Sequence, residues 1–290
     1  MALALTLARR GLGRTAPNPP VGCVLVRAGR VVGRGWTQPG GRPHAETEAL
    51  RRAGEAARGA TAYVSLEPCN HYGQTPPCTE ALIAAGVARC VVAARGRDPQ
   101  VAGAGLARLR DAGMAVETGV AESEAAAFYS GYFRQRRAGR PFVTLKLATT
   151  LDGRIATRRG ESQWITGPEA RARAHRLRAT HDAVMVGSGT AVADNPRLSV
   201  RIPGLAGAQP LRVVVDGRLR LPLTHDLVAR ARAHPTLLIT RPDALPDRRQ
   251  AYADAGVDLA EAGVADDGTM STHAIVEALG ARGVTHVLVE

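Results

Sequence analysis

Short β-branched runs alternate with segments of helical periodicity along the first half of this 290-residue chain. The runs 21–26 and 31–36 flank an Arg-Ala-Gly-Arg turn, which predicts a β-hairpin. Small apolar residues at helical spacing after His44 predict a helix that begins there and packs closely on a sheet. Further strands are expected at 62–66, 88–93 and 115–117, and further helices at 2–13, 105–112 and 122–137. This alternation predicts a three-layer α/β/α domain.

A polar, basic stretch at 134–140 ends at Pro141 and separates this pattern from a second one. Because domain boundaries fall in such linkers, we expect two domains, 1–140 and 141–290. The run Gly187-Ser188-Gly189-Thr190 follows an apolar strand and either cradles a phosphate or forms a plain tight turn. Strands are expected at 142–148, 183–186, 211–215, 236–240 and 284–289, and helices from Pro168 and at 273–279. The second half is therefore another α/β domain.

Composition changes this picture little. Apolar residues make up 45% of the chain and aromatic residues only 3%, so we expect cores built from Ala, Val and Leu. A formal net charge of +12 is common among proteins that bind polyanions. The basic residues are scattered singly, however, and all except Lys146 are arginines, a bias that resembles the excess of Ala and Gly. Charge alone therefore does not indicate a nucleic-acid partner.

The four cysteines, Cys23, Cys69, Cys78 and Cys90, are too few for a disulfide-built protein. Two of them, Cys23 and Cys90, lie in Val-rich runs and are expected in a core. Residues 1–10 have their arginines after the apolar part, the reverse of a secretory signal. No run approaches the roughly 18 apolar residues that a membrane span needs. We therefore expect a cytoplasmic protein with no membrane partner; a homo-oligomer is compatible with the sequence.

The candidate chemistry is concentrated between His44 and Cys78. One imidazole and two thiolates, from His44, Cys69 and Cys78, form a donor set that suits Zn²⁺ and leaves a fourth position open for water. Zinc makes such a water a nucleophile at neutral pH. Glu46 lies two residues after the histidine, where a carboxylate can carry a proton from the water to a leaving amine. This order of residues is the signature of zinc-dependent nucleobase deaminases.

Two other interpretations use the same residues. A nucleic-acid deaminase that acts on a flipped base has the same zinc core, but such an enzyme would not explain residues 141–290. A structural zinc site that only folds the loop has no need of Glu46 beside an open coordination position. The sequence therefore favours a catalytic zinc site for hydrolytic deamination.

Motifs along the whole chain support a narrower assignment. In the first half they are Pro17-Asn18-Pro19-Pro20-Val21-Gly22, His44-Ala45-Glu46 and 67–78, the last with eight residues between its cysteines. In the second half they are Lys146-Leu147-Ala148, Leu151-Asp152-Gly153, 161–166 and Ala193-Asp194-Asn195-Pro196. Together they resemble the bifunctional riboflavin-biosynthesis enzymes, in which a pyrimidine deaminase is fused to a reductase. Gln74 departs from the family, which commonly has a basic residue there.

The resemblance implies a cytidine-deaminase-like first domain and a dihydrofolate-reductase-like second domain. The first would remove the 2-amino group of 2,5-diamino-6-(5-phosphoribosylamino)pyrimidin-4-one, with zinc on His44, Cys69 and Cys78 and with Glu46 as the proton carrier. The second would use NADPH to reduce the ribosyl group to a ribityl group.

By the same resemblance, cofactor contacts fall on Ala148, Trp164, Thr190 and Asp194, and substrate contacts on Ser162, Arg178, Leu198, Arg201 and Glu290. An arginine at 178 or 201 suits a phosphate, which a guanidinium can grip with two hydrogen bonds. Asn18 and Lys146 are further candidates. As the sole lysine, Lys146 suits a site that needs a compact ammonium group, unless it is incidental.

The family chain continues past Glu290 into a glycine-rich cofactor loop and further strands. The resemblance therefore implies an incomplete reductase domain in which the strand 284–289 leaves a sheet edge uncovered. On this basis we expect zinc-dependent deamination, with NADPH binding and reduction impaired.

Overall fold

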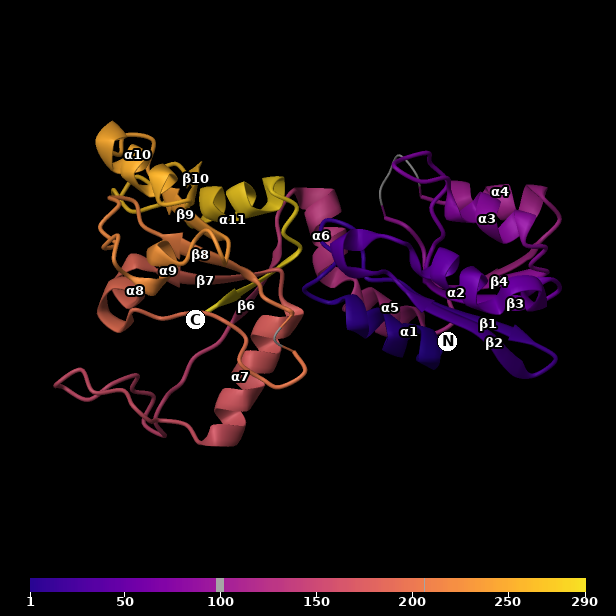
Figure 1. Cartoon of the computed structure of the whole chain (residues 1–290), viewed down its shortest axis with the longest axis horizontal. Coiled ribbons are helices and arrows are strands. Elements are labelled where there is room, and N and C mark those ends of the chain that lie inside the picture. The colour runs from indigo at the N-terminus through magenta and orange to yellow at the C-terminus, as the bar shows by residue number, and fades with distance from the viewer. Residues whose placement is uncertain (98–101, 206) are drawn as a thin grey trace. The chain divides into compact units, whose positions relative to one another are not determined.

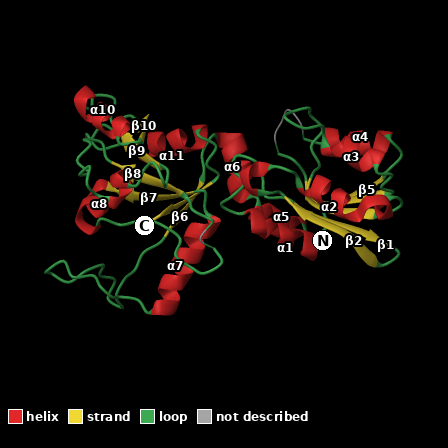
Figure 2. Ribbon diagram, in the orientation of Figure 1, coloured by secondary structure: helices red, strands yellow, loops and turns green. Residues whose placement is uncertain are grey.

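The structure, a computed structural model, describes residues 1–97, 102–205 and 207–290 (Figure 1). The chain divides into two compact units, Met1–Ala138 and Gly139–Glu290. Each unit has its own sheet, with helices packed against it (Figure 2). Within the described residues, no helix combines the length and the apolar character needed to cross a membrane.

Unit 1 has a five-stranded sheet in the order β2-β1-β3-β4-β5. Its strands are β1 (Gly22–Arg27), β2 (Arg30–Trp36), β3 (Thr61–Leu66), β4 (Arg89–Ala94) and β5 (Ala115–Thr118). Its helices are α1 (Ala2–Ala8), α2 (Ala45–Ala53), α3 (Cys78–Ala84), α4 (Ala104–Asp111), α5 (Glu122–Phe128) and α6 (Ser130–Ala138). Helices α1 and α5 lie on one face of the sheet and α2, α3 and α4 on the other (Figure 1). The predicted three-layer α/β/α architecture is confirmed.

Helix α2 lies unusually close to the hairpin formed by β1 and β2. A Cβ atom on Gly35 would lie 2.1 Å from the carbonyl oxygen of Ala45, and one on Gly33 would lie 2.3 Å from that of Ala49. Only glycine fits at such an approach. The predicted close packing through small residues is thus confirmed, and it fixes the start of α2, where His44 is the N-cap residue.

The single helix expected at 122–137 is wrong, because α5 and α6 are separated at Tyr129. The Tyr129 side chain is fully buried, and a buried hydroxyl needs a hydrogen-bond partner. Its oxygen lies 2.7 Å from Ser65 Oγ and 3.2 Å from the carbonyl oxygen of Pro20. The residue at the break between the two helices, Tyr129, therefore holds the proline-rich segment 17–20 in place through its hydroxyl group.

Unit 2 has a six-stranded sheet in the order β10-β9-β8-β7-β11-β6, and every neighbouring pair is parallel. Its strands are β6 (Phe142–Leu145), β7 (Ala183–Gly187), β8 (Leu211–Val215), β9 (Thr236–Thr240), β10 (Asp258–Glu261) and β11 (His286–Val289). Its helices are α7 (Pro168–Thr180), α8 (Ser188–Asp194), α9 (Asp226–Ala229), α10 (Pro246–Asp254) and α11 (Thr272–Ala281). Since all strands run the same way, their carboxyl ends lie at one edge of the sheet.

Alternation along these strands divides the core of unit 2 into two clusters. Val214 and Leu288 pack in the cluster that includes residues of α7, α8, α9 and α10. Val213 and Val287, one position earlier in each strand, pack with α11. Successive strand residues point to opposite faces, so helices cover both faces of the sheet.

Several expectations for unit 2 are wrong. The strand that ends before Glu290 does not leave an uncovered edge, because β11 is hydrogen-bonded to β7 on one side and to β6 on the other. The edge strand on that side of the sheet is β6, which ends at Leu145 rather than at Ala148. The run 187–190 is not a plain tight turn, because α8 begins at Ser188 with Gly187 as its N-cap residue; the alternative, a phosphate cradle, stays a prediction.

Four elements of unit 2, α8, α9, α10 and β10, were not expected from the sequence pattern. Pro246 at the first position of α10 is the start signal that could have revealed that helix.

Candidate zinc centre and active-site pocket

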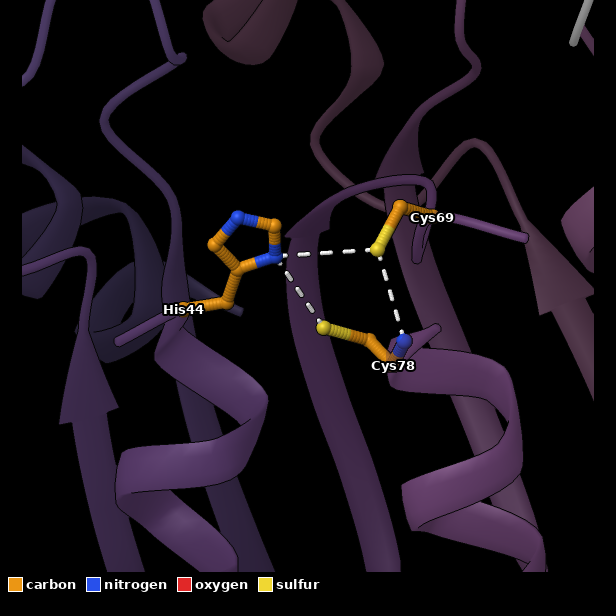
Figure 3. A group of neighbouring side chains, drawn as sticks. All are labelled: His44, Cys69 and Cys78. Carbon is orange, nitrogen blue, oxygen red and sulfur yellow. Dashed lines mark hydrogen bonds between the residues drawn. The ribbon is translucent and has the colours of Figure 1, made fainter. Parts of the chain in front are cut away.

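Three elements of unit 1 bring the predicted metal ligands together (Figure 3). His44 precedes α2, Cys69 follows β3, and Cys78 is the first residue of α3. His44 Nδ1 lies 3.3 Å from Cys78 Sγ and 3.6 Å from Cys69 Sγ. One ligand atom from each residue lies within 4.8 Å of the other two. The predicted constellation is therefore assembled in space.

The electrostatics of the two thiols favour metal binding. The backbone N–H of Cys78 donates to Cys69 Sγ at 3.3 Å, and the pKa of Cys69 is lowered to about 4, mainly by the hydrogen bond from the Cys78 thiol. The pKa of Cys78 is raised by that same hydrogen bond and by burial, because two adjacent thiols in a buried site do not both ionise without a cation. One nitrogen and two sulfur donors at these separations fit a zinc ion, which would allow both thiols to ionise.

Glu46 lies on the first turn of α2 and lines the pocket that also contains His44 and Cys69. Its residue surface is only 3% exposed. Burial, and next the negative charge of Cys69, raise the pKa of its carboxyl group to about 7. A carboxyl group with a pKa near neutrality both accepts and releases a proton readily, which is the property that a general acid–base needs.

Two of the three ligands, His44 and Cys69, line a pocket of about 200 Å³ together with Glu46. The segment 17–21 contributes to its wall, and the predicted candidate Asn18 is part of it, with Asn18 Nδ2 donating to the carbonyl oxygen of Gly41 at 3.1 Å. The other walls include Thr37, Arg42, Leu66, Glu67, Pro68, Asn70, His71, Gly96, Arg97, Tyr132 and Arg136. The pocket therefore contains one buried carboxyl group, that of Glu46, and several basic side chains in its lining.

Glu67 is a structural residue of this pocket that the sequence analysis did not single out. Its carboxylate accepts hydrogen bonds from the backbone N–H groups of Gly96, Gly103 and Gly105 at 3.0, 3.2 and 3.1 Å. Hydrogen bonds to an ionised carboxylate are stronger than neutral ones, so Glu67 holds the backbone at Gly96, Gly103 and Gly105 close to the pocket. Its position directly before Pro68-Cys69 was the available signal.

In unit 2, three predicted residues form one ion cluster. Arg178 Nε lies 2.6 Å from Glu290 Oε1, and a second nitrogen of Arg178 lies 2.8 Å from Glu290 Oε2. Lys146 Nζ lies 3.5 Å from Glu290 Oε2. Burial acts to raise the pKa of Glu290, but the hydrogen bonds and charge of Arg178 outweigh it and lower that pKa. The fork of Arg178 is therefore occupied by Glu290, and its predicted grip on a phosphate stays a prediction.

The other predicted residues of unit 2 lie apart from this cluster. Ser162 and Trp164 line a shallow pocket formed by the segment 149–165, and Ala148 is half-buried just before it. Thr190 and Asp194 are exposed on α8, and Arg201 is also exposed. Leu198 is buried in the core, so that a substrate contact there would have to come from its backbone.

Comparisons with known proteins cover both units. Residues 1–94 match the family model described as the cytidine and deoxycytidylate deaminase zinc-binding region. Residues 141–290 match the RibD C-terminal domain. The chain belongs to the RibD family.

Individual relatives agree with this membership. The riboflavin biosynthesis protein RibD of Escherichia coli is 50% identical over 239 residues, which are 79% of this chain and 65% of the relative. The protein of the same description from Chlamydia muridarum is 41% identical over all of this chain and 78% of the relative. The chain thus spans about two thirds of the length of several RibD proteins that it matches.

Solved structures of the family share the fold. Acinetobacter baumannii RibD aligns with a TM-score of 0.88 and 42% identity over all of this chain and 79% of that one. A diaminohydroxyphosphoribosylaminopyrimidine deaminase/5-amino-6-(5-phosphoribosylamino)uracil reductase from Thermotoga maritima aligns with a TM-score of 0.85 and 36% identity, over 100% and 79% of the two chains. The α/β fold class predicted for both halves is confirmed.

Proposed function

We propose that unit 1 is a zinc-dependent deaminase of 2,5-diamino-6-(5-phosphoribosylamino)pyrimidin-4-one and that unit 2 is the NADPH-dependent reductase of the deaminated product. The observation that carries the proposal is the pocket of unit 1, where a buried carboxyl group, Glu46, lies beside one imidazole and two thiols. Membership of the RibD family supports the choice of substrate and the pairing of the two activities.

In the deamination, His44, Cys69 and Cys78 would hold the zinc ion, whose chemistry when bound is to activate water at neutral pH. Glu46 accepts a proton from the attacking water and delivers it to the 2-amino group, which departs as ammonia while oxygen replaces nitrogen on the ring. Burial of Glu46 keeps bulk water from competing for that proton.

In unit 2, the arrangement of the strands suits a nucleotide cofactor. Lys146 follows β6, Glu290 follows β11, and α8 begins directly after β7, so all three lie at the carboxyl edge of the parallel sheet. Ligands of open α/β sheets bind at that edge. NADPH, when bound, supplies a hydride for the ribosyl carbon. Glu290, 3.5 Å from Lys146 Nζ, would then orient this ammonium group, and we propose that Lys146 donates a hydrogen bond to a substrate oxygen.

The two half-reactions test the proposal separately. Purified chain loaded with zinc should release ammonia from the pyrimidine substrate, lose that activity with a chelator and regain it with zinc. NADPH oxidation is then followed with the deaminated product. Absence of zinc-dependent ammonia release would overturn the assignment of unit 1. The expectation of impaired reduction stays a prediction, which the second assay decides.

A nucleic-acid deaminase remains the other candidate for the zinc core, but no described feature favours it. Tight, salt-sensitive binding of transfer RNA in a filter assay would count for it.

We propose a cytoplasmic location on the ground that all four cysteines are free thiols.

A further inference from the structure

The pocket of unit 1 has an excess of positive charge at its rim. Two carboxylates line it: Glu46 is buried beside the metal ligands, and Glu67 is engaged by three backbone N–H groups. The basic side chains in the lining are Arg42, His71, Arg97 and Arg136. A ligand whose ring reaches the zinc ligands would therefore place any anionic group among cations.

Among these cations, Arg42 is held in a particular position. Its Nη1 donates to Thr75 Oγ1 at 2.5 Å, and its Nη2 lies 3.4 Å from the position of a Cβ atom on Gly73. The guanidinium group thus lies against the segment that joins the two cysteine ligands. That segment contains no arginine or lysine of its own, and Gln74, between the two contacted residues, is neutral.

Arg42 also has spare hydrogen-bonding capacity. Among the residues that the structure describes, no carboxylate lies within 4.0 Å of its guanidinium, and the Thr75 hydroxyl is its one acceptor. Arg97, by contrast, lies over the ring of Phe133, with its Cζ 5.0 Å from the ring centroid. A half-buried guanidinium with unused N–H donors suits a planar, two-point grip on a phosphate.

We propose that Arg42 binds the phosphate group of the pyrimidine substrate and makes unit 1 selective for phosphorylated over unphosphorylated substrates. Arg42 is then a binding residue that reaches the segment 73–75 from outside it, and the neutral Gln74 needs no role in charge recognition. The inference rests on the deaminase function proposed for unit 1. It adds which residue of this chain recognises the end of the substrate remote from the reacting amino group.

The test is steady-state deamination by zinc-loaded Arg42→Ala, Arg42→Lys and Arg34→Ala. Arg34 is an exposed arginine on β2 outside the pocket, so its removal controls for the loss of one charge. For the phosphorylated substrate we expect KM to rise roughly ten- to a hundredfold in Arg42→Ala with kcat changed less than about threefold, which is the pattern of lost ground-state binding. The KM of Arg42→Lys should lie between those of wild type and Arg42→Ala, because lysine keeps the positive charge but cannot form two parallel hydrogen bonds to one phosphate.

The same substrate without its phosphate separates binding from damage to the fold. Its KM should be equal in wild type, Arg42→Ala and Arg34→Ala, and ribose 5-phosphate should inhibit wild type at concentrations that leave Arg42→Ala unaffected. If wild type deaminates and Arg42→Ala keeps the wild-type KM for the phosphorylated substrate, the inference is overturned while the function of unit 1 stands. Equal losses on both substrates, or loss of zinc, would also overturn it, since Arg42 would then be structural.

Discussion

The two candidate sites are assembled by different means. In unit 1, His44 and Cys78 stand at the starts of two helices and Cys69 at the end of a strand, so the backbone fixes where each ligand points. In unit 2, the residues that meet are Lys146 and Arg178 around Glu290, and charge attraction holds them together. The first arrangement is set by the fold before any ligand binds, whereas the second depends on the ion cluster itself.

This difference predicts different consequences of substitution. A substitution at the unit 1 site that leaves the metal ligands in place should lower the rate of deamination and change the unfolding free energy little. A change in the unit 2 cluster should remove stability first, because an unpaired buried charge is costly.

The largest effect is expected for Glu46→Gln. The substitution keeps the size of the side chain and removes the proton carrier, so kcat for deamination should fall roughly 10²- to 10⁴-fold while zinc content is unchanged. Ammonia release and metal analysis on the same preparation measure both quantities. Glu48→Gln is the matched control, since Glu48 is on the same helix and pairs with Arg51 and Arg52. Wild-type activity in Glu46→Gln would mean that another group moves the proton.

The zinc constellation could be predicted from sequence because its chemistry is local. A histidine, a carboxylate two residues later and two proline-preceded cysteines have few other uses in that order, and the elements that carry them have clear start signals. The position of Glu67 directly before Pro68-Cys69 marks it as part of the site, but its hydrogen bonds could not be predicted, because the partners are backbone N–H groups far along the chain. Gly96, Gly103 and Gly105 have no polar side chain, so their residue types do not reveal that their backbone N–H groups donate to a carboxylate.

The second largest effect is expected for Glu290→Gln, on stability. The Glu290 side chain is 9% exposed and that of Arg178 is 14% exposed, so neutralising the carboxylate leaves a largely buried arginine without its counter-charge. We expect a loss of about 2–3 kcal/mol in the unfolding free energy of unit 2. Hydrogen exchange followed by mass spectrometry reports each unit separately and should show faster exchange in the core strands of unit 2 and unchanged exchange in unit 1.

A double variant distinguishes lost pairing from lost packing. Arg178→Met combined with Glu290→Leu removes both charges and should be closer to wild type than Glu290→Gln alone, because apolar replacement of a buried pair is often neutral. A double variant less stable than the single one would mean that packing, rather than charge, holds this region together.

A smaller effect is expected for Gly105→Ala in unit 1. The added Cβ atom would lie 2.2 Å from the carbonyl oxygen of Pro68, directly before the ligand Cys69, so backbone must shift. We expect unit 1 to lose about 1–3 kcal/mol of stability and to bind zinc more weakly, as measured by chemical unfolding and by competition with a chelator. Gly189→Ala is the control, because a Cβ atom there has no neighbour within 4 Å. Equal zinc affinity in Gly105→Ala and wild type would show that the site tolerates movement of its strand end.

The unit 2 cluster was only partly accessible from sequence. Parallel strands that neighbour one another in the chain are connected by helices, and the sequence pattern does not reveal the order of the strands within the sheet. The insertion of β11 between β7 and β6, which brings Glu290 beside Lys146 and Arg178, is a property of the topology. The family resemblance supplied Arg178 and Glu290 as separate substrate contacts, and it did not reveal that they pair with each other.

The smallest effect is expected from pH and concerns the same cluster. The pKa of Glu290 is lowered in the folded protein, because Arg178 and Lys146 outweigh the opposing effect of burial. A carboxylate with a lowered folded pKa stabilises the fold fully above its unfolded pKa, about 4.3, and that stabilisation is lost as pH falls through the folded value. Unit 2 of wild type should therefore lose more stability than unit 2 of Glu290→Gln as the pH is lowered from 6 to below about 4. Glu277→Gln, which removes an exposed carboxylate of α11, should follow wild type. Parallel pH profiles for wild type and Glu290→Gln would mean that the ionised Glu290 carboxylate does not stabilise the folded state. The contrast between the site of unit 1, which the backbone positions, and the cluster of unit 2, which charge attraction holds together, would then be wrong.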